Sequence, residues 1–181
     1  MRVAQIDPGH GGSNNGARGH GIIEERYALR MARSVKAWMG DDCRLTREDD
    51  STIDYSDRAK LTGTNAVWCL HNNASKNPKA RGFHVYVLPG DKVGRLIAKK
   101  LIGYLPPEIL NPRIIEAKWS LGRWIRNARY LLSVYKGPTV LVEMLFVSND
   151  QDAALLKNEK IKDGIAQAIA KSAKDWIDGT F

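Results

Sequence analysis

The chain has 181 residues, of which 43% are hydrophobic, a size suited to one domain with a sizeable core and rather short for two. No apolar run approaches the roughly 18 residues of a membrane span, which argues against a membrane-spanning protein. The net charge of +8 favours a polyanionic partner, either nucleic acid, an anionic membrane or an anionic cell-wall polymer. Charge alone does not choose among these partners.

Strand and helix patterns alternate through the first 104 residues. An apolar stretch at 2–7 predicts a strand that ends in a glycine-rich loop, and residues 24–39 repeat apolar side chains at helical spacing before Gly40. The further predicted elements are a strand at 43–47, a helix at 54–64, strands at 66–71 and 83–88, and a helix at 91–104.

The second half of the chain is less regular. The segment 106–135 is ambiguous, and its part WIRNARYLLSVY fits a helix or an edge strand. A buried strand is predicted at 139–144, followed by a long helix at about 159–178. Strands interleaved with helices predict a single α/β domain with a largely parallel, twisted central sheet of five to six strands flanked by helices.

Both cysteines, Cys43 and Cys69, sit inside apolar strand-like runs. We expect buried free thiols there, with a disulfide or a metal role as the alternative.

Ionisable side chains collect at the ends of three predicted strands. His10 follows the first strand in the loop IDPGHGG, His71 ends the strand AVWCLH, and Glu143 lies near the end of TVLVEM. Open α/β sheets place their ligand sites at the carboxyl ends of strands, so the topology would gather these residues. The loop matches neither the dinucleotide fingerprint nor the P-loop, which disfavours a phosphate cradle.

Two histidines and one carboxylate with an open fourth position form a catalytic zinc set, and a further carboxylate could act as general base. Glu24 and Glu25 are further candidates at the start of the first helix. Acidic residues are favoured in a first helical turn by the helix dipole, so position alone does not assign either one a function.

Several motifs follow one another in a recognisable order: IDPGHGG, a helix opening with Glu, LTR, LHNNAS, RGFHVYVL and VLVEMLFVSND. Together they resemble the zinc-dependent N-acetylmuramoyl-L-alanine amidases of the amidase 3 type. The resemblance covers residues 2–156 and extends naturally to the last helix. It implies that one Zn²⁺ per chain is held by His10, Glu24 and His71, with Glu143 as the catalytic residue. In the family, the glutamate ligand lies five residues before the leucine of an L-x-x-A pattern in the first helix. Leu29 and Ala32 fit this pattern and so assign the ligand to Glu24, with Glu25 as the alternative.

Two features depart from the family pattern. Asn72 stands where a small or apolar residue is usual, and the sequence EML replaces a glutamate followed by a small residue and glycine. We expect these changes to reshape the groove wall and to remove no ligand. Asn73 and His20 are expected to contact the substrate, and His84 is assigned no role.

The resemblance implies hydrolysis of the amide bond between N-acetylmuramic acid and L-alanine in peptidoglycan. The N-terminal residues MRVAQID lack the features of a secretory signal. We therefore expect a phage endolysin made in the host cytoplasm that reaches the wall after holin release, with 1–181 as one catalytic domain and no separate wall-binding domain. A catalytic domain cut from a larger autolysin would look the same.

We expect a monomer whose partner is peptidoglycan, with no nucleic-acid partner and with electrostatic attraction to an anionic wall or membrane surface. Two alternatives stay open. One is a basic, non-catalytic module that binds cell wall or nucleic acid, although no nucleic-acid-binding motif supports it. The other is a zinc hydrolase that acts on a different amide.

Overall fold

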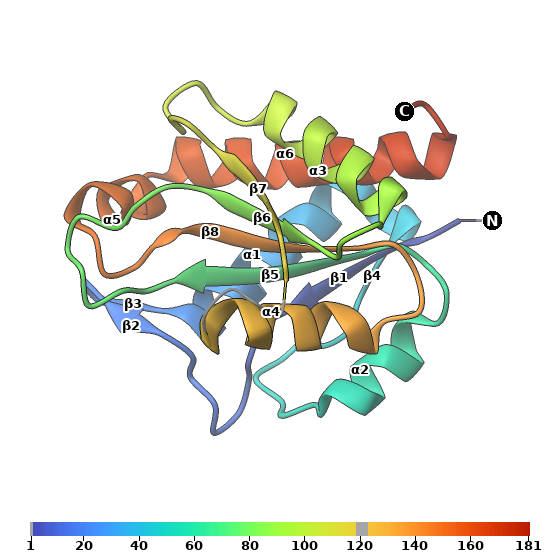
Figure 1. Ribbon diagram of the computed structural model, residues 1–181, viewed down its shortest axis with the longest axis horizontal. Helices are drawn as coiled ribbons and strands as arrows, with labels where there is room; N and C mark the ends of the chain where they lie inside the picture. The colour runs from blue at the N-terminus through green and yellow to red at the C-terminus, as the bar shows by residue number, and fades with distance from the viewer. Residues whose placement is uncertain (1, 119–122) are drawn as a thin grey trace.

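A six-stranded sheet forms the middle layer of the computed structural model, which describes residues 2–118 and 123–181 (Figure 1). The strand order is β4-β1-β5-β8-β6-β7, and only the β8–β6 pairing is antiparallel. The fold class expected from the sequence is thereby confirmed. The six strands are β1 (Ala4–Pro8), β4 (Cys43–Leu45), β5 (Val67–Asn73), β6 (His84–Val87), β7 (Arg113–Glu116) and β8 (Thr139–Phe146).

Helices cover both faces of the sheet. In Figure 1, α3 and α6 lie along one side of the sheet, and α4 lies with α2 along the other. α1 packs on the side of α6, and α5 follows β8. The helices are α1 (Glu24–Met39), α2 (Tyr55–Thr62), α3 (Lys92–Tyr104), α4 (Arg123–Val134), α5 (Asp150–Lys157) and α6 (Glu159–Asp178), with a 3-10 turn at Gly40–Asp42.

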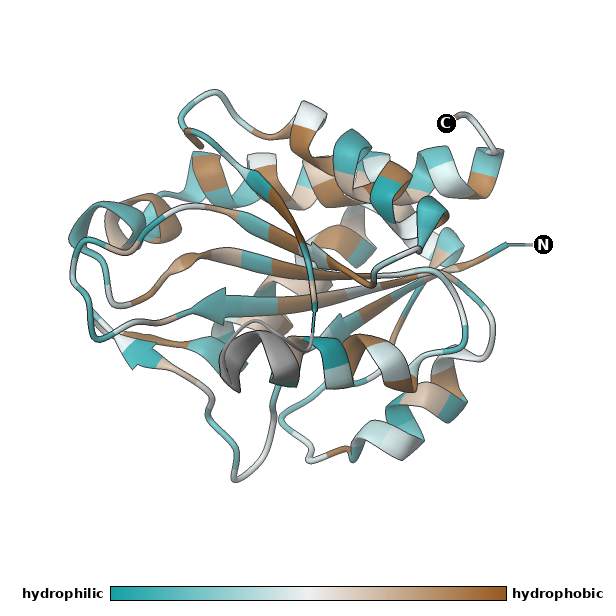
Figure 2. Cartoon of the chain, viewed as in Figure 1, coloured by the Kyte–Doolittle hydropathy of each residue, from teal (hydrophilic) through white to brown (hydrophobic). Residues whose placement is uncertain are grey.

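Two hydrophobic clusters hold the layers together. The larger lies between the sheet and α1, α3 and α6, where Trp68 and Ile165 are fully buried. The smaller lies under α4 and includes Leu132 and Tyr135. Figure 2 shows that β5 is hydrophobic along most of its length and hydrophilic at its arrowhead. Its carboxyl end is therefore the place where the buried strand turns polar.

Helix ends follow ordinary capping chemistry. The side chains of Asp91, Asn149 and Asn158 accept hydrogen bonds from the first free backbone N–H groups of α3, α5 and α6. α1 ends at Gly40, which adopts φ 56°. In the described ranges, no helix has the length and apolar character to cross a bilayer.

The structure resolves the ambiguous second half. WIRNARYLLSV is helical, as part of α4, and Tyr135 follows the helix. The edge strand β7, the short helix α5 and the hairpin of β2 (Arg18–Gly19) and β3 (Ile22–Ile23) were not predicted, because each is too short for a clear periodic pattern. Cys43 and Cys69 are buried free thiols, as expected.

Candidate metal centre

The glycine-rich loop after β1 brings its backbone close to two other elements. A Cβ atom at Gly9 would overlap the imidazole ring of His71. One at Gly16 would lie 2.5 Å from Glu24 Oε2 and 2.6 Å from His10 Cδ2. His10 itself adopts φ 61°, an uncommon conformation for a residue with a side chain. The absence of side chains at Gly9 and Gly16 therefore leaves room for the imidazole of His10 to contact His71 from β5 and Glu24 from α1.

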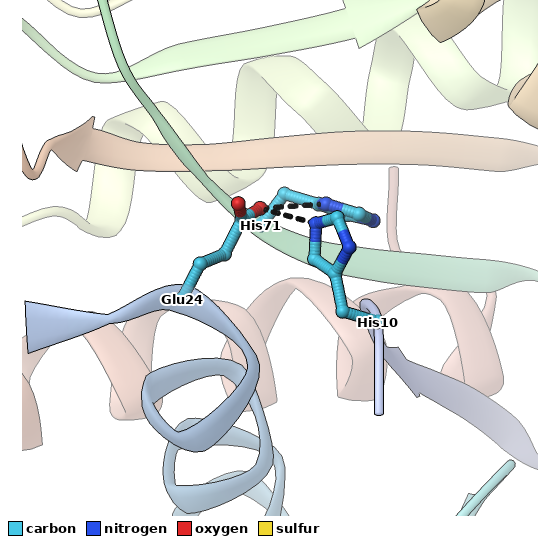
Figure 3. Close-up of side chains that lie close together, drawn as sticks. All are labelled: His10, Glu24 and His71. Atoms are coloured by element: carbon cyan, nitrogen blue, oxygen red, sulfur yellow. Dashed lines mark hydrogen bonds and ion pairs between the residues drawn. The ribbon is translucent and has the colours of Figure 1, made fainter. Parts of the chain in front are cut away.

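Three side chains from distant parts of the sequence converge at this point. Figure 3 shows His10 from the loop, Glu24 from the start of α1 and His71 from β5 pointing toward one another. Glu24 Oε1 lies 3.0 Å from His10 Nε2 and 2.8 Å from His71 Nδ1. One potential ligand atom from each residue falls within a mutual distance of 4.8 Å. The cluster is compact enough for one metal ion.

Backbone donors hold the Glu24 carboxylate in place. Ala17 N–H donates to Oε2 over 2.6 Å and Asn72 N–H donates to Oε1 over 3.1 Å. Burial alone would raise the pKa of Glu24, but the hydrogen bonds and charges of the two imidazoles outweigh it and lower that pKa. Burial likewise opposes the rise in the pKa of His10 that Glu24 causes. The cluster therefore favours an ionised carboxylate at its centre.

The donor set fits a catalytic zinc ion. Two imidazoles and one carboxylate are the protein ligands of one class of catalytic zinc site, which keeps a further position for water. His71 Nε2 is buried and has no hydrogen-bond partner among the described residues. His10 Nδ1 lies 3.1 Å from Asn14 Oδ1, a contact of the kind that orients a ligating ring from outside the metal shell.

Glu143 lies beside this cluster and outside it. Its Cα is the register partner of His71 Cα across β5 and β8, so both side chains stand on the same face of the sheet. The side chain is fully buried, and neither carboxylate oxygen has a hydrogen-bond partner in the described part of the chain. Burial and the charge of Glu24 raise the pKa of Glu143 well above its usual range. Such a carboxyl group holds a proton readily.

The pairing of β5 and β8 becomes irregular just beyond Glu143. The register shifts between His71 and Asn73, and Leu145 on the partner strand adopts φ 67°. Glycine adopts this conformation without strain, which explains why glycine is usual at this place in the motif that the sequence resembles. Here a leucine takes it, with its side chain almost fully buried.

Glu25, the alternative ligand, points elsewhere. Its carboxylate lies 3.8 Å from the guanidinium of Arg47 and 4.0 Å from that of Arg26. It is not part of the group formed by His10, Glu24 and His71. His20 sits in the turn between β2 and β3, where its Nε2 lies 3.2 Å from Asp150 Oδ1. The structure brings neither residue into the cluster.

The two asparagines after His71 differ in their surroundings. Asn72 is fully buried and its Nδ2 donates to the carbonyl of Met144 over 2.5 Å, so it ties β5 to β8 and does not line a groove. The expected effect of Asn72 on the groove wall, which would act through the β5–β8 pairing, stays a prediction. Asn73 lies on the same side as His71, with its Nδ2 3.4 Å from His84 Nδ1.

Two buried arginines that the sequence analysis did not select fix the shape of the loop. Arg58 donates to the carbonyl groups of Pro8 and His10, over 2.8 Å and 2.5 Å. Arg47 donates to the carbonyl groups of Pro8 and Gly9, over 3.1 Å and 2.8 Å. Sequence analysis missed both arginines because a polar residue in a short segment gives no indication that it will be buried. The one available signal was that Arg47 belongs to the motif LTR.

Comparisons with known proteins agree with this geometry. Residues 5–175 match the sequence profile of the family Amidase_3, described as N-acetylmuramoyl-L-alanine amidase. The chain is 28% identical over 224 residues to N-acetylmuramoyl-L-alanine amidase AmiA of Escherichia coli (strain K12), covering 98% of this chain and 78% of that protein. It is 28% identical over 171 residues to N-acetylmuramoyl-L-alanine amidase LytC of Bacillus subtilis (strain 168), covering 91% of this chain and 33% of that protein.

The fold is similar to that of a solved enzyme. The catalytic domain of CwlV, an N-acetylmuramoyl-L-alanine amidase from Bacillus (Paenibacillus) polymyxa var. colistinus, superposes with a TM-score of 0.81. The two sequences are 25% identical, and the match covers 98% of this chain and 99% of that one.

Proposed function

The chain belongs to the N-acetylmuramoyl-L-alanine amidase family, and from this premise we propose that it is a zinc hydrolase that cleaves the bond between N-acetylmuramic acid and L-alanine in peptidoglycan. The observation that carries the proposal is the cluster of His10, Glu24 and His71 with the unpartnered carboxyl group of Glu143 beside it. Three metal ligands with no further reactive group nearby would be compatible with a purely structural metal ion. The extra buried carboxyl group points to catalysis.

Each residue has a definite task in this proposal. His10, Glu24 and His71 would hold one Zn²⁺, which when bound lowers the pKa of a coordinated water and polarises the scissile carbonyl. Glu143 takes the proton of the attacking water on a carboxylate oxygen and returns it to the departing L-alanine nitrogen. A raised pKa suits the second half of this cycle, in which the carboxyl group must hold a proton before delivering it.

Digestion of purified peptidoglycan tests the reaction directly. We expect the zinc-loaded protein to release free stem peptides, identified by mass spectrometry, and exhaustive chelation to abolish the release until Zn²⁺ is restored. Full activity of metal-free protein would contradict the mechanism. Release of other fragments would indicate a different bond, and binding without any release would support a non-catalytic wall-binding module.

Neighbouring glutamates provide a matched pair of variants for the ligand assignment. Glu24→Ala should lose zinc, because it removes the carboxylate that contacts both imidazoles. Glu25→Ala should keep stoichiometric zinc, since that carboxylate faces Arg47 and Arg26. Metal content is measured on folded protein by elemental analysis. The opposite pattern would shift the ligand by one residue along α1.

Glu143→Gln separates the catalyst from the ligands. The glutamine keeps the shape and removes the basicity, so we expect folded, zinc-loaded protein with turnover reduced by about 10²-fold or more. His71→Ala should instead lose zinc and activity together. If Glu143→Gln lost its zinc, Glu143 would be a ligand, and near-normal turnover would move the general base to another residue, with His20 considered first.

We further propose that the protein acts as a phage endolysin, made in the host cytoplasm and admitted to the wall by a holin, and that it works as a monomer on peptidoglycan. Asn73 and His20 are its candidate substrate contacts. Expression in a host should lyse the cells only when a holin or a membrane-permeabilising agent is added. Lysis without either would overturn the endolysin assignment, and a dimer in native mass spectrometry would overturn the monomer.

A further inference from the structure

Four polar side chains form a row across one face of the sheet. The register pairs His71 of β5 with Glu143 of β8, Glu143 with His84 of β6, and His84 with Arg113 of β7. Directly paired residues on neighbouring strands point to the same face, so the row starts at a candidate zinc ligand and ends at an arginine on the edge strand. We call His71, Glu143, His84 and Arg113 the polar row.

The outer half of the polar row is accessible. His84 is half-buried, with its ring against that of Phe146 at a centroid distance of 5.6 Å. Arg113 is exposed, and its guanidinium takes part in none of the ion pairs found within the described ranges. Burial lowers the pKa of His84, the positive charge of Arg113 lowers it further, and the negative charge of Asp152 opposes both effects. The two side chains therefore share one electrostatic environment, which is open to a negative ligand.

The orientation of the bound substrate follows from the role of Glu143 in proton transfer. In the proposed function, on which this inference rests, Glu143 delivers a proton to the L-alanine nitrogen, so the stem peptide departs on the Glu143 side of the metal cluster. His84 and Arg113 are the next two members of the row on that side. The glycan then lies toward His10 and β1.

The distances match the second residue of the stem peptide. Neighbouring strands are about 4.8 Å apart, which places the backbone of Arg113 about 10 Å from that of Glu143. In an extended peptide, a carboxylate on the second residue lies about 7 Å from the scissile nitrogen. An arginine side chain spans the remaining gap. We propose that Arg113, with His84 beside it, forms a subsite for the free α-carboxylate of an isoglutamate at the second position of the stem peptide.

This subsite would distinguish a carboxylate from a carboxamide on the second residue of the stem peptide. A guanidinium binds a carboxylate through charge-assisted hydrogen bonds, often two at once, and binds a neutral carboxamide less well. Stem peptides with isoglutamate should therefore be better substrates than those in which the same group is amidated to isoglutamine.

Two synthetic muramyl peptides that differ only in isoglutamate or isoglutamine test the subsite in the zinc-loaded protein. We expect kcat/KM to be about tenfold higher for the isoglutamate substrate, mainly through KM. Arg113→Gln should bring the ratio close to one, with the larger loss on the isoglutamate substrate, and Arg113→Lys should restore part of the preference. His84→Asn should reduce the ratio by a smaller factor, since this variant keeps the positive charge of Arg113.

The opposite edge of the sheet provides the control. Arg44→Gln removes an exposed arginine from β4, at the other end of the strand order, and should leave the ratio at its original value. Equal cleavage of both substrates by the parent protein would overturn the subsite alone, as would an equal loss on both substrates in Arg113→Gln. Failure of the zinc-loaded parent to cleave either substrate would overturn the proposed function and the subsite with it.

Discussion

The two faces of the central sheet are built from the same strands and have opposite characters. On β1, Ile6 faces the helices α1 and α6 within the large hydrophobic cluster, and its neighbour Asp7 faces α2 and α4. We call these the core face and the site face. The core face is packed with apolar side chains such as Trp68, whereas the site face carries His71 and Glu143. Alternation along each strand thus keeps these polar groups apart from the larger apolar cluster.

The site face can carry these polar groups because most of them are paired. Asp7 is almost fully buried and accepts hydrogen bonds from Arg58, Thr46 and the hydroxyl of Tyr135. Arg58 extends the network to the carbonyl of His10. A buried charge is costly when unpaired, so the network must stay complete, and its completeness also fixes the loop that presents His10. Glu143 is the exception, with no such partner in the described ranges.

Asp7→Asn should give the largest change in stability. It leaves the Arg58 guanidinium buried without its countercharge, and breaking a buried ion pair from one side costs about 3–5 kcal/mol in the free energy of unfolding. Urea unfolding of the metal-free protein measures this. The matched control is Asp57→Asn, which removes the partner of Lys60 in an exposed pair and should cost less than about 1 kcal/mol. Similar losses in both variants would mean that the buried network contributes little.

Glu143→Gln should have a smaller effect on metal-free protein, one that depends on pH. Because the folded state raises the pKa of Glu143, its share of stability is complete below the ordinary value of about 4.5 and is lost as pH rises through the folded-state pKa. The glutamine variant should therefore lose less stability than the parent as the pH rises above about 4.5. The pKa of His10 is raised as well, and the difference between the two profiles isolates the contribution of Glu143 because both proteins keep His10.

Chemical unfolding at several pH values, with chelator present, gives the two profiles. Glu108→Gln, a change at an exposed carboxylate, should follow the parent. Identical slopes for the parent and Glu143→Gln would show that the Glu143 carboxyl group ionises in the folded protein as easily as in water.

Ile165→Val should have the smallest effect and should sharpen the contrast between the faces. It removes one buried methylene group from the core face, which costs about 0.5–1.5 kcal/mol. Zinc affinity and turnover per folded molecule should stay unchanged, because His71 and Glu143 stand on the other face of the sheet. Titration with Zn²⁺ and peptidoglycan digestion measure both, and a loss of zinc affinity would show that the two faces are mechanically coupled.

Much of the site could be predicted because strand ends carry a strong signal. His10, His71 and Glu143 each follow or end an apolar run, and a largely parallel sheet gathers such ends. The choice between Glu24 and Glu25 needed the family resemblance, because adjacent residues in a first helical turn look alike in sequence. Only the geometry shows that Glu24 contacts both imidazoles while Glu25 faces Arg47.

The amino-acid sequence by itself determined the α/β class, the order of the main elements and the residue types at the strand ends, since periodicity and composition are local properties. Tertiary structure alone decided which polar groups are buried and what they contact. Arg58 is one of several polar residues in a short helix until folding places it against Asp7 and the carbonyl of His10. Likewise, His84 and Arg113 join the row of Glu143 only through strand register, which is set by pairing between segments far apart in the chain.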